Sequence, residues 1–384
     1  MIHRAMPAIL KASGWRWAGR LVPALLLGLL GLSACRDALE PLKIGFVGSL
    51  TGRYAGLAVA GRDGVLLAVE EVNRAGGVNG RTVEVIIRDN RHDPATAQQN
   101  FRELKDAGVV AVIGPMTSKM GVVLQPLADQ LELVLISPTV STDSLSDRDD
   151  WFFRLNPPLT SNATKLAEYL KRSGLNKISV CCDQANASYS LNWLAALTKA
   201  YTGLGGRIVA EELYQSGAEV GFLKMAERLL AGGPEAVVFI TGAMDTALLA
   251  QQVRKLGSQV PLFATEWAFT SDVIDFGGQR VEGLRAFVTY NGDSQSPRHL
   301  AFKASFEQRF GYRPSSAAVL AYESVGYLST ALRHNQRPEA LQQTLQEIDR
   351  FTGLLGEIRF NRQGDPQRQT FLTTIRDGRF TVLD

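Results

Sequence analysis

The chain has 384 residues, of which 45% are hydrophobic, 8% aromatic and 21% charged. This composition is typical of a globular protein and excludes a mainly disordered or fibrous chain. The formal net charge of +3 comes from the first 34 residues, which hold Arg4, Lys11, Arg16 and Arg20 and no acidic residue. No basic stripe with interleaved aromatic residues follows residue 40, which argues against a nucleic-acid partner. The length suffices for two domains.

The basic start is followed by an apolar run over residues 21–31, which is too short to cross a bilayer as a mature helix. We predict a signal peptide over residues 1–34. The run ends in Leu32-Ser33-Ala34-Cys35, which resembles a bacterial lipobox, where small residues precede the cleavage site and the cysteine thiol receives the lipid. We therefore predict lipidation at Cys35 and a periplasmic or cell-surface protein that is anchored to the membrane without spanning it. An ordinary secretory signal that ends near a cysteine is the alternative.

From residue 43 onward, short β-branched runs alternate with longer helical patterns. The first series predicts strands over 43–48, 82–88, 109–114 and 133–137, with helices over 61–75, 94–107 and 118–131. A second series after Pro157-Pro158 predicts strands over 177–182, 207–211, 236–240 and 261–264, then a helix over 322–332 and a strand, turn and hairpin over 356–383. The alternation predicts an α/β fold of parallel sheets with helices on both faces.

Parallel α/β sheets bind ligands at the carboxyl ends of their strands, where the next helix presents unpaired N–H groups. The loops at these positions are the places to look for a site. They cover residues 49–54, 114–119, 137–142, 183–189, 241–245 and 265–268.

Several motifs in these loops and beside them carry a family resemblance. They are IGFVGSLTG at 44–52, EVNRAGGVNG at 71–80, VIGP at 112–115, ISP at 136–138 and AYESV at 321–325. Their order and spacing resemble the branched-chain-amino-acid-type (LivJ-like) periplasmic solute-binding proteins of ABC transporters, here in a lipoprotein form. The resemblance covers nearly all of the mature chain.

The resemblance implies two doubly wound, Rossmann-like lobes of the type I periplasmic-binding-protein (Venus flytrap) fold, with the ligand in the cleft between them. Three crossings of the chain would join the lobes. We expect the first ligand-binding lobe over residues 41–157 plus 289–360. The second would cover residues 158–288 plus 361–384.

Within this family, hydroxyl and backbone N–H groups of the first lobe hold a ligand carboxylate. The resemblance places Ser118 and Ser141 at the hydroxyl positions and Thr139 among the backbone donors, and we include Thr117 from the same loop. Ser118 also starts a predicted helix, where free N–H groups and the helix dipole favour an anion. A role for Ser118 as a helix N-cap alone is the alternative.

The resemblance also places an acid of the second lobe, Glu266, against the α-ammonium of the ligand. A solvated loop acid is the alternative. Tyr189 and Tyr54 are expected as pocket walls. Trp267 is expected either to wall the pocket or to pack at the hinge. The small residues at 241–243 stand where relatives that bind aliphatic amino acids commonly have aromatic side chains, so the side-chain pocket departs from the leucine type.

The sequence lacks the loop and metal motifs of the common enzyme classes, namely a nucleophile elbow, a P-loop, an H-E-x-x-H helix and a dinucleotide-binding loop. We therefore expect no enzyme activity, no cofactor and no metal. The adjacent Cys181 and Cys182 are expected to be buried and inert. His92, His299 and His334 are expected on the solvated surface.

We expect the chain to capture an amino acid or related small carboxylate and to deliver it, as a monomer, to the permease subunits of an ABC importer. Ligand contacts to both lobes would shift the protein from an open to a closed form. A sensing lipoprotein is the second hypothesis, in which the same cleft binds an amide, urea or aromatic acid and reports to a receptor. An enzyme on this α/β frame is the third.

Overall fold

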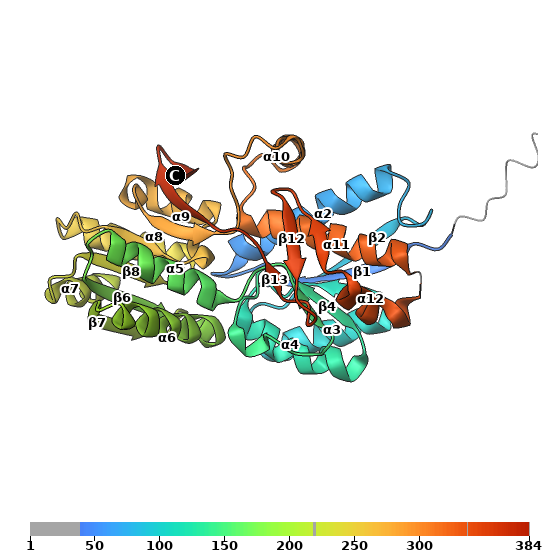
Figure 1. Ribbon diagram of the computed structural model, residues 1–384, viewed down its shortest axis with the longest axis horizontal. Coiled ribbons are helices and arrows are strands. Elements are labelled where there is room, and N and C mark those ends of the chain that lie inside the picture. Colours follow the sequence, from blue (N-terminus) through green and yellow to red (C-terminus); the bar gives the residue numbers. More distant parts are fainter. Residues whose placement is uncertain (1–38, 218–219, 336, 384) are drawn as a thin grey trace, which may run out of the picture. The chain divides into compact units, whose positions relative to one another are not determined.

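Two β-sheets organise the computed structural model, which describes residues 39–217, 220–335 and 337–383 (Figure 1). Residues Pro41–Asp384 form one unit and Met1–Glu40 another. The predicted signal peptide over residues 1–34 and the lipidation site Cys35 lie outside the described residues. All that follows concerns the larger unit.

The first sheet has five parallel strands in the order β2-β1-β3-β4-β5. Its strands are β1 (Leu42–Gly48), β2 (Val83–Asp89), β3 (Ala111–Ile113), β4 (Val134–Ser137) and β5 (Phe152–Arg154). The helices that connect β1 to β4 are α2 (Ala55–Arg74), α3 (Pro94–Asp106) and α4 (Ser118–Leu131). Side chains alternate between the two faces of β3, so Ile113 joins the core under α2 whereas Val112 joins the core under α3 and α4.

Elements from late in the chain complete this first lobe. They are α10 (Pro297–Phe310), α11 (Ser316–His334), α12 (Leu341–Glu347) and the small antiparallel sheet of β11 (Arg350–Thr352), β12 (Glu357–Phe360) and β13 (Pro366–Gln367). Helix α11 packs along α2, and Figure 1 shows these red and blue elements beside each other. Ile358 and Phe360 of β12 belong to the same buried cluster as Ile44 and Phe46 of β1.

The second sheet has seven strands in the order β15-β14-β10-β9-β8-β6-β7. They are β6 (Lys177–Asp183), β7 (Arg207–Tyr214), β8 (Ala236–Ile240), β9 (Leu262–Ala264), β10 (Arg285–Val288), β14 (Phe371–Arg376) and β15 (Arg379–Val382). The first five of these are parallel, and the C-terminal hairpin β14–β15 adds antiparallel strands at one edge.

Helices cover both faces of the second sheet. They are α5 (Leu159–Arg172), α6 (Ala187–Gly203), α7 (Phe222–Ala231), α8 (Ala243–Lys255) and α9 (Ser271–Gly277). Phe239 of β8 packs in the core with α7 and α8, and its neighbour Val238 packs in the core with α5 and α6. The sheet and its helices are the second lobe.

The expected α/β fold of parallel sheets is confirmed, and the chain passes between the two sheets after β5, after β10 and after β13. The predicted helix over 61–75 begins earlier, at Ala55, and the helix predicted over 322–332 extends over Ser316–His334. Strands β5 and β10 were not predicted. The exact residues at which one lobe ends and the other begins stay a prediction.

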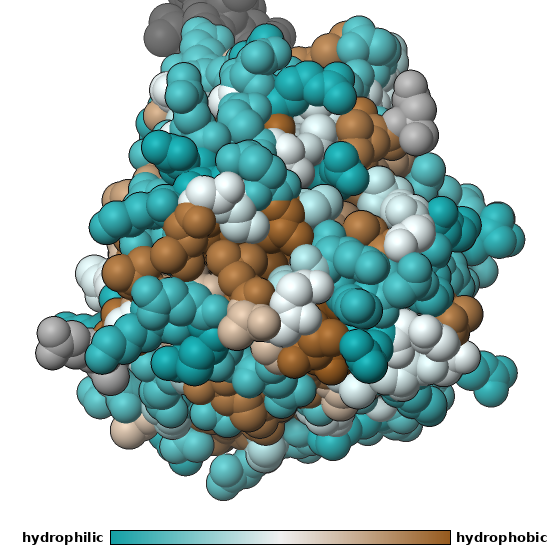
Figure 2. Space-filling model, turned by 90° about the vertical axis from the view of Figure 1, so that its left-hand side faces the viewer, coloured by the Kyte–Doolittle hydropathy of each residue, from teal (hydrophilic) through white to brown (hydrophobic). Residues whose placement is uncertain are grey.

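The face of the molecule that Figure 2 turns to the viewer is mainly hydrophilic, with a band of apolar side chains across its middle. Leu213 of β7 and Leu223 of α7 are among the exposed large apolar side chains. Within the described ranges, no helix is both long enough and apolar enough to cross a bilayer.

The expected burial of the two cysteines is confirmed, since Cys181 and Cys182 are both fully buried and unpaired. Burial raises the pKa of the Cys182 thiol to about 12, which favours its protonated form. The expectation of a surface histidine is wrong for His299. This side chain is fully buried, where Tyr290 Oη lies 2.9 Å from its Nε2 and the Ser294 carbonyl 2.7 Å from its Nδ1.

Candidate functional site

A pocket lies between the strand-end loops of the two sheets. It encloses about 480 Å³ of space not occupied by atoms, including the part open to solvent. Its lining comes from both lobes and from residues near the crossings: Leu57, Met116, Thr117, Ser118, Thr139, Asn156, Asn186, Tyr189, Glu266, Trp267, Phe269, Thr270, Thr289, Ser316, Ala317 and Leu320.

Most of the residues predicted for the site meet at this pocket. Those that line it are Thr117, Ser118, Thr139, Tyr189, Glu266 and Trp267. Ser141 lies directly behind the lining, because its backbone N–H donates to Ser118 Oγ over 3.4 Å. Tyr54 is not among the lining residues, and it contacts the site through Trp267.

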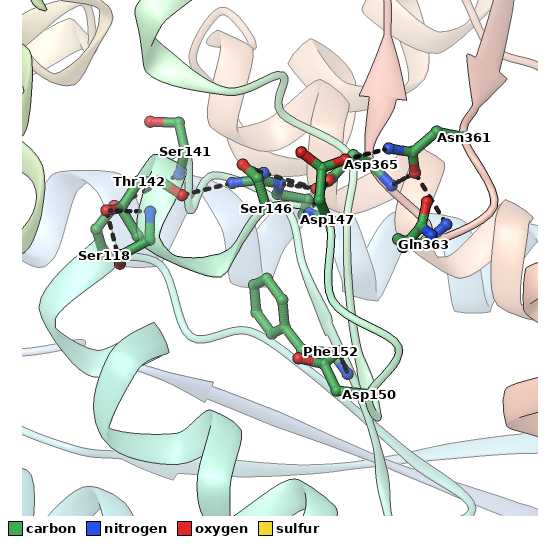
Figure 3. Close-up of polar contacts among 12 residues, drawn as sticks. Ser118, Ser141, Thr142, Ser146, Asp147, Asp150, Phe152, Asn361, Gln363 and Asp365 are labelled. Carbon is green, nitrogen blue, oxygen red and sulfur yellow. Dashed lines mark hydrogen bonds and ion pairs between the residues drawn. The ribbon is translucent and has the colours of Figure 1, made fainter.

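The two serine loops form one end of the site. Ser118 is the first residue of α4, whose first turn presents backbone N–H groups without partners inside the helix. Ser118 and Ser141 are 2% and 0% exposed, and Ser141 Oγ has no hydrogen-bond partner within the described ranges. Figure 3 shows the two serines side by side. Buried hydroxyl and N–H donors at a helix start suit an anionic group.

The loop that carries Ser141 is held in place by its neighbours. Ser137 Oγ donates to the Pro115 carbonyl over 2.7 Å, and Thr139 Oγ1 donates to the Met116 carbonyl over 2.6 Å. The adjoining loop needs glycine at position 114, where φ is +116° and a Cβ would stand 2.1 Å from the Val47 carbonyl oxygen. These contacts fix the positions of the serines before a ligand arrives.

A buried arginine links the same loop to the turn between β12 and β13. Arg154 is fully buried, and its Nη1 donates to the Thr142 carbonyl over 2.8 Å while its Nε donates to Asp365 Oδ1 over 2.7 Å. Asp365 Oδ2 in turn accepts from the Asp147 backbone N–H over 2.8 Å. Figure 3 shows this chain of polar contacts running from the serines to Asn361 and Asp365.

Glu266 forms the other end of the site, in the short 3₁₀ helix Glu266–Ala268 that follows β9. Both of its carboxylate oxygens are buried and have no hydrogen bond of standard geometry to the described residues. Burial raises the pKa of Glu266 to about 7, although polar groups of Tyr189, Asn162 and Trp193 nearby oppose this rise. The expected acid is therefore buried rather than solvated, and an incoming cation would provide the partner that it lacks.

Aromatic rings make the wall beside Glu266. The Trp267 ring meets Tyr189 edge-on at a centroid distance of 5.6 Å, and Tyr54 stacks on Trp267 at 5.6 Å. Tyr54 Oη lies 2.6 Å from Ser216 Oγ and 3.2 Å from Asp183 Oδ2. Tyr54 therefore supports the wall from the first lobe instead of facing the pocket.

Further polar contacts join the lobes around the pocket. The Lys119 backbone N–H in the first turn of α4 donates to Asn186 Oδ1 over 3.0 Å, and Arg53 forms an ion pair with Asp245. The expectation for His92 is wrong. This side chain is half-buried between the lobes, with its Nε2 at 3.3 Å from the Ala185 carbonyl, and burial lowers its pKa.

Sequence reasoning missed part of the lining. Asn186 falls within the loop 183–189, from which only Tyr189 was predicted. Asn156 directly precedes the Pro157-Pro158 pair at the crossing, and Thr270 follows the loop 265–268 by two residues, so proximity to a strand end was the available signal. Ala317 and Leu320 come from α11, and no local pattern marks them.

The charge of the lining limits the chemistry of the site. Among the described residues that line the pocket, Glu266 is the one with an acidic side chain and none is lysine, arginine or histidine. The described residues also contain no group of three or more histidine, cysteine, aspartate or glutamate side chains that could hold a metal ion. The arrangement offers an anion-accepting end, a carboxylate end and apolar walls between them.

Comparison with known proteins agrees with this geometry, because residues 41–379 match the family described as periplasmic binding protein. The chain belongs to the periplasmic binding protein family. The leucine-, isoleucine-, valine-, threonine- and alanine-binding protein of Pseudomonas aeruginosa is 24% identical over 347 residues, which are 88% of this chain and 91% of that relative.

Two solved structures show how closely the fold of this periplasmic binding protein is shared. The branched-chain amino acid transporter substrate-binding protein LivJ from Streptococcus pneumoniae, in complex with isoleucine, has a TM-score of 0.84 at 22% identity and covers 89% of this chain and 99% of its own. A solute-binding protein of an R. palustris ABC transporter, in complex with benzoate, has a TM-score of 0.80 at 18% identity over 89% and 95% of the two chains.

The expected family and the type I fold of two doubly wound lobes are thus confirmed. Membership of this family makes the chain a solute-binding protein of the extracytoplasmic space.

Proposed function

We propose that this periplasmic binding protein captures an amino acid or a related small carboxylate between its lobes and delivers it to an ABC importer from a lipid anchor at Cys35. The proposal depends on one observation: a single pocket has an anion-accepting end and a carboxylate end. Ser118 and the start of α4 offer donors to a carboxylate, and the buried carboxyl group of Glu266 lacks a partner for its charge. A zwitterion supplies both missing partners.

The charge of the pocket supports an amino acid over a simple cation or anion. A cation alone would leave the donors at Ser118 and Ser141 without an acceptor, and an anion alone would add a negative charge near Glu266. The apolar part of the lining, with Leu57 and Trp267, accepts the carbon skeleton between the two charged groups. The Pseudomonas aeruginosa relative, named for five amino acids, points the same way.

The experiment is calorimetry over a panel of the twenty amino acids, together with mass spectrometry of small molecules released when the purified protein is denatured. Ser118→Ala and Glu266→Gln should each weaken binding by about 1–3 kcal/mol without unfolding the protein, since each leaves a charged ligand group short of a partner. Unchanged affinity in both variants would refute the site. Absence of heat for every amino acid would refute the amino-acid ligand.

One observation favours a second candidate, an aromatic acid without an amino group. With a pKa of about 7, Glu266 is partly neutral near neutral pH and tolerates a ligand that brings no cation. Trp267 and Phe269 offer ring contacts, and the R. palustris neighbour is in complex with benzoate. In that case Glu266→Gln would leave the affinity for benzoates unchanged while Ser118→Ala still weakens it. A sensing role, with a receptor in place of the permease, would use the same cleft.

A further inference from the structure

Two uncharged side chains of the pocket lining, those of Asn156 and Thr270, each have a polar atom without a partner among the described residues. Asn156 Oδ1 and Thr270 Oγ1 are buried without a hydrogen-bond partner within the described residues, and each residue is 3% exposed. Asn156 lies on the crossing between β5 and α5, and Thr270 follows β9 of the second lobe. The same pocket thus has uncompensated polar atoms on the crossing and on the second lobe.

The orientation of the Asn156 amide is fixed by its surroundings. Its Nδ2 donates to the Thr139 carbonyl over 3.2 Å, which leaves Oδ1, an acceptor, as the unpaired atom. The backbone on either side is also held, because Leu155 N–H donates to the Ser137 carbonyl over 3.0 Å and Leu159 N–H to the Ser141 carbonyl over 2.8 Å. Asn156 Oδ1 is therefore a preformed acceptor.

Thr270 stands at the N-cap position of α9, where a threonine hydroxyl ordinarily accepts a hydrogen bond from its own helix. No such bond is made here, and the hydroxyl remains free to donate or to accept. The Thr270 hydroxyl does not cap α9, and Thr270 lines the pocket. Because buried polar groups are normally hydrogen-bonded, a ligand group is the partner that this hydroxyl would have.

The surroundings select a neutral group. Phe269, Leu320 and Ala317 also line the pocket, and its described lining contains no lysine, arginine or histidine that could pair with a second acid on the ligand. A purely aliphatic side chain would leave the buried Asn156 and Thr270 oxygens without partners, so it would not gain the hydrogen bonds that a polar ligand makes there. A hydroxyl or primary amide would satisfy them.

We propose that Asn156 and Thr270 form a subsite that accepts a neutral hydrogen-bond donor of the ligand. The inference rests on the proposed function, and it narrows the ligand to a small carboxylate that carries a hydroxyl or an amide group. Thr289 and Ser316 add polar atoms to the same lining. Asn156 and Thr270 are then specificity residues, whereas Ser118 and Glu266 bind the charged groups of the ligand.

The test is calorimetry with matched pairs of ligands that differ in the donor but hardly in shape. The pairs are threonine and valine, glutamine and methionine, and 4-hydroxybenzoate and 4-methylbenzoate. We expect the donor-bearing member of at least one pair to bind about tenfold more tightly, because its partner leaves buried polar groups unpaired. Thr270→Val and Asn156→Leu should each reduce this ratio toward one. Thr344→Val, which changes a buried threonine of α12 outside the pocket, should preserve it.

The outcomes separate the inference from the proposed function. If carboxylates bind but the apolar member of each pair binds as well as its partner, the subsite is wrong and the proposed function stands. A donor preference that survives in Thr270→Val and in Asn156→Leu also overturns the subsite. If no carboxylate in the panel binds, the proposed function and the subsite fail together. If Asn156→Leu does not fold, Thr270→Val alone decides the matter, because the Thr270 hydroxyl makes no hydrogen bond to the described residues that the fold would lose.

Discussion

The Tyr54 hydroxyl lies 3.2 Å from Asp183 Oδ2, although the two residues belong to different lobes. The preceding residue, Arg53, forms an ion pair with Asp245 of the second lobe, and Tyr214 Oη donates to the other oxygen of that carboxylate over 2.7 Å. The loop before α2 therefore bridges the cleft next to the pocket without lining it. Contacts of this kind exist in a closed arrangement and are lost when lobes separate.

We predict that Arg53→Met weakens ligand binding about five- to tenfold, mainly by speeding dissociation, because it removes an attraction that the closed form alone makes. Stopped-flow fluorescence gives the dissociation rate constant directly. Arg62→Met is the matched control. The side chains of Arg62 and its partner Asp63 are 33% and 5% exposed, nearly the same as the 33% and 4% of Arg53 and Asp245. Arg62 and Asp63 both lie on α2, however, so their ion pair does not join the lobes. Equal losses of affinity in the two variants would rule out a closure effect.

Glu266 should make the stability of the unliganded protein depend on pH. Its pKa is about 7 in the folded protein against 4.5 for the unperturbed group. Because the folded state holds the proton more tightly, the contribution of this group is fully present below pH 4.5 and is lost as the pH rises through 7. The loss amounts to about 3 kcal/mol. Denaturant unfolding at pH 5 and pH 8 measures this loss. The free energy of unfolding should fall more between the two pH values in the native protein than in Glu266→Gln, and the comparison cancels the effects of the other titrating groups.

Binding of an amino acid should release a proton from the same carboxyl group. The ligand ammonium favours the ionised form of Glu266, so we expect proton release at pH 6 and an affinity that rises from pH 6 to pH 8. Calorimetry in two buffers of different ionisation enthalpy measures the released protons. Glu266→Gln should abolish the release, and its persistence in that variant would point to another group, such as His92.

The sequence predicted those parts of the fold that depend on local patterns. Strand β8 is found over the predicted residues 236–240, because a buried parallel strand is a continuous run of apolar and β-branched residues. Strands β5 and β10 were missed because each of these short strands includes an arginine, Arg154 or Arg285, whereas β3 and β9, which are no longer than these two, are uniformly apolar. Helix α2 begins at Ala55, six residues before its predicted start at residue 61.

The site also has residues that local patterns predicted and residues that depend on contacts distant in sequence. Ser118 and Glu266 follow strands, so the rule that ligands bind at strand ends, together with the family resemblance, located them. His92 looked like part of a solvated turn because the neighbour that covers it, Ala185, is 93 residues away in sequence. The free hydroxyl of Thr270 and the orientation of Asn156 depend on contacts that no local pattern encodes.

The lipid anchor is open to a direct test, although Cys35 lies outside the described residues. Cys35→Ser should move the protein from the membrane fraction to the soluble fraction of cells, because the thiol that would receive the lipid is gone. Mass spectrometry of the native protein should find acyl chains on a mature chain that starts at residue 35. Cys181→Ser is the matched control, as this buried cysteine is remote from the anchor in sequence. A membrane-bound Cys35→Ser protein would contradict lipidation.

The buried pair of Arg154 and Asp365 should contribute strongly to stability. Asp365→Asn leaves the fully buried guanidinium of Arg154 without a counter-charge, and we expect it to lower the free energy of unfolding by about 3–5 kcal/mol. Urea denaturation followed by circular dichroism measures the change. Glu168→Gln is the control, because its pair with Arg172 is exposed on α5 at 3.8 Å and should change stability by less than about 0.5 kcal/mol. Since Arg154 also holds the Thr142 carbonyl next to Ser141, Asp365→Asn should weaken ligand binding under conditions where the protein is still fully folded. A loss of stability without any loss of affinity would show that the pair supports the fold but not the ligand loop.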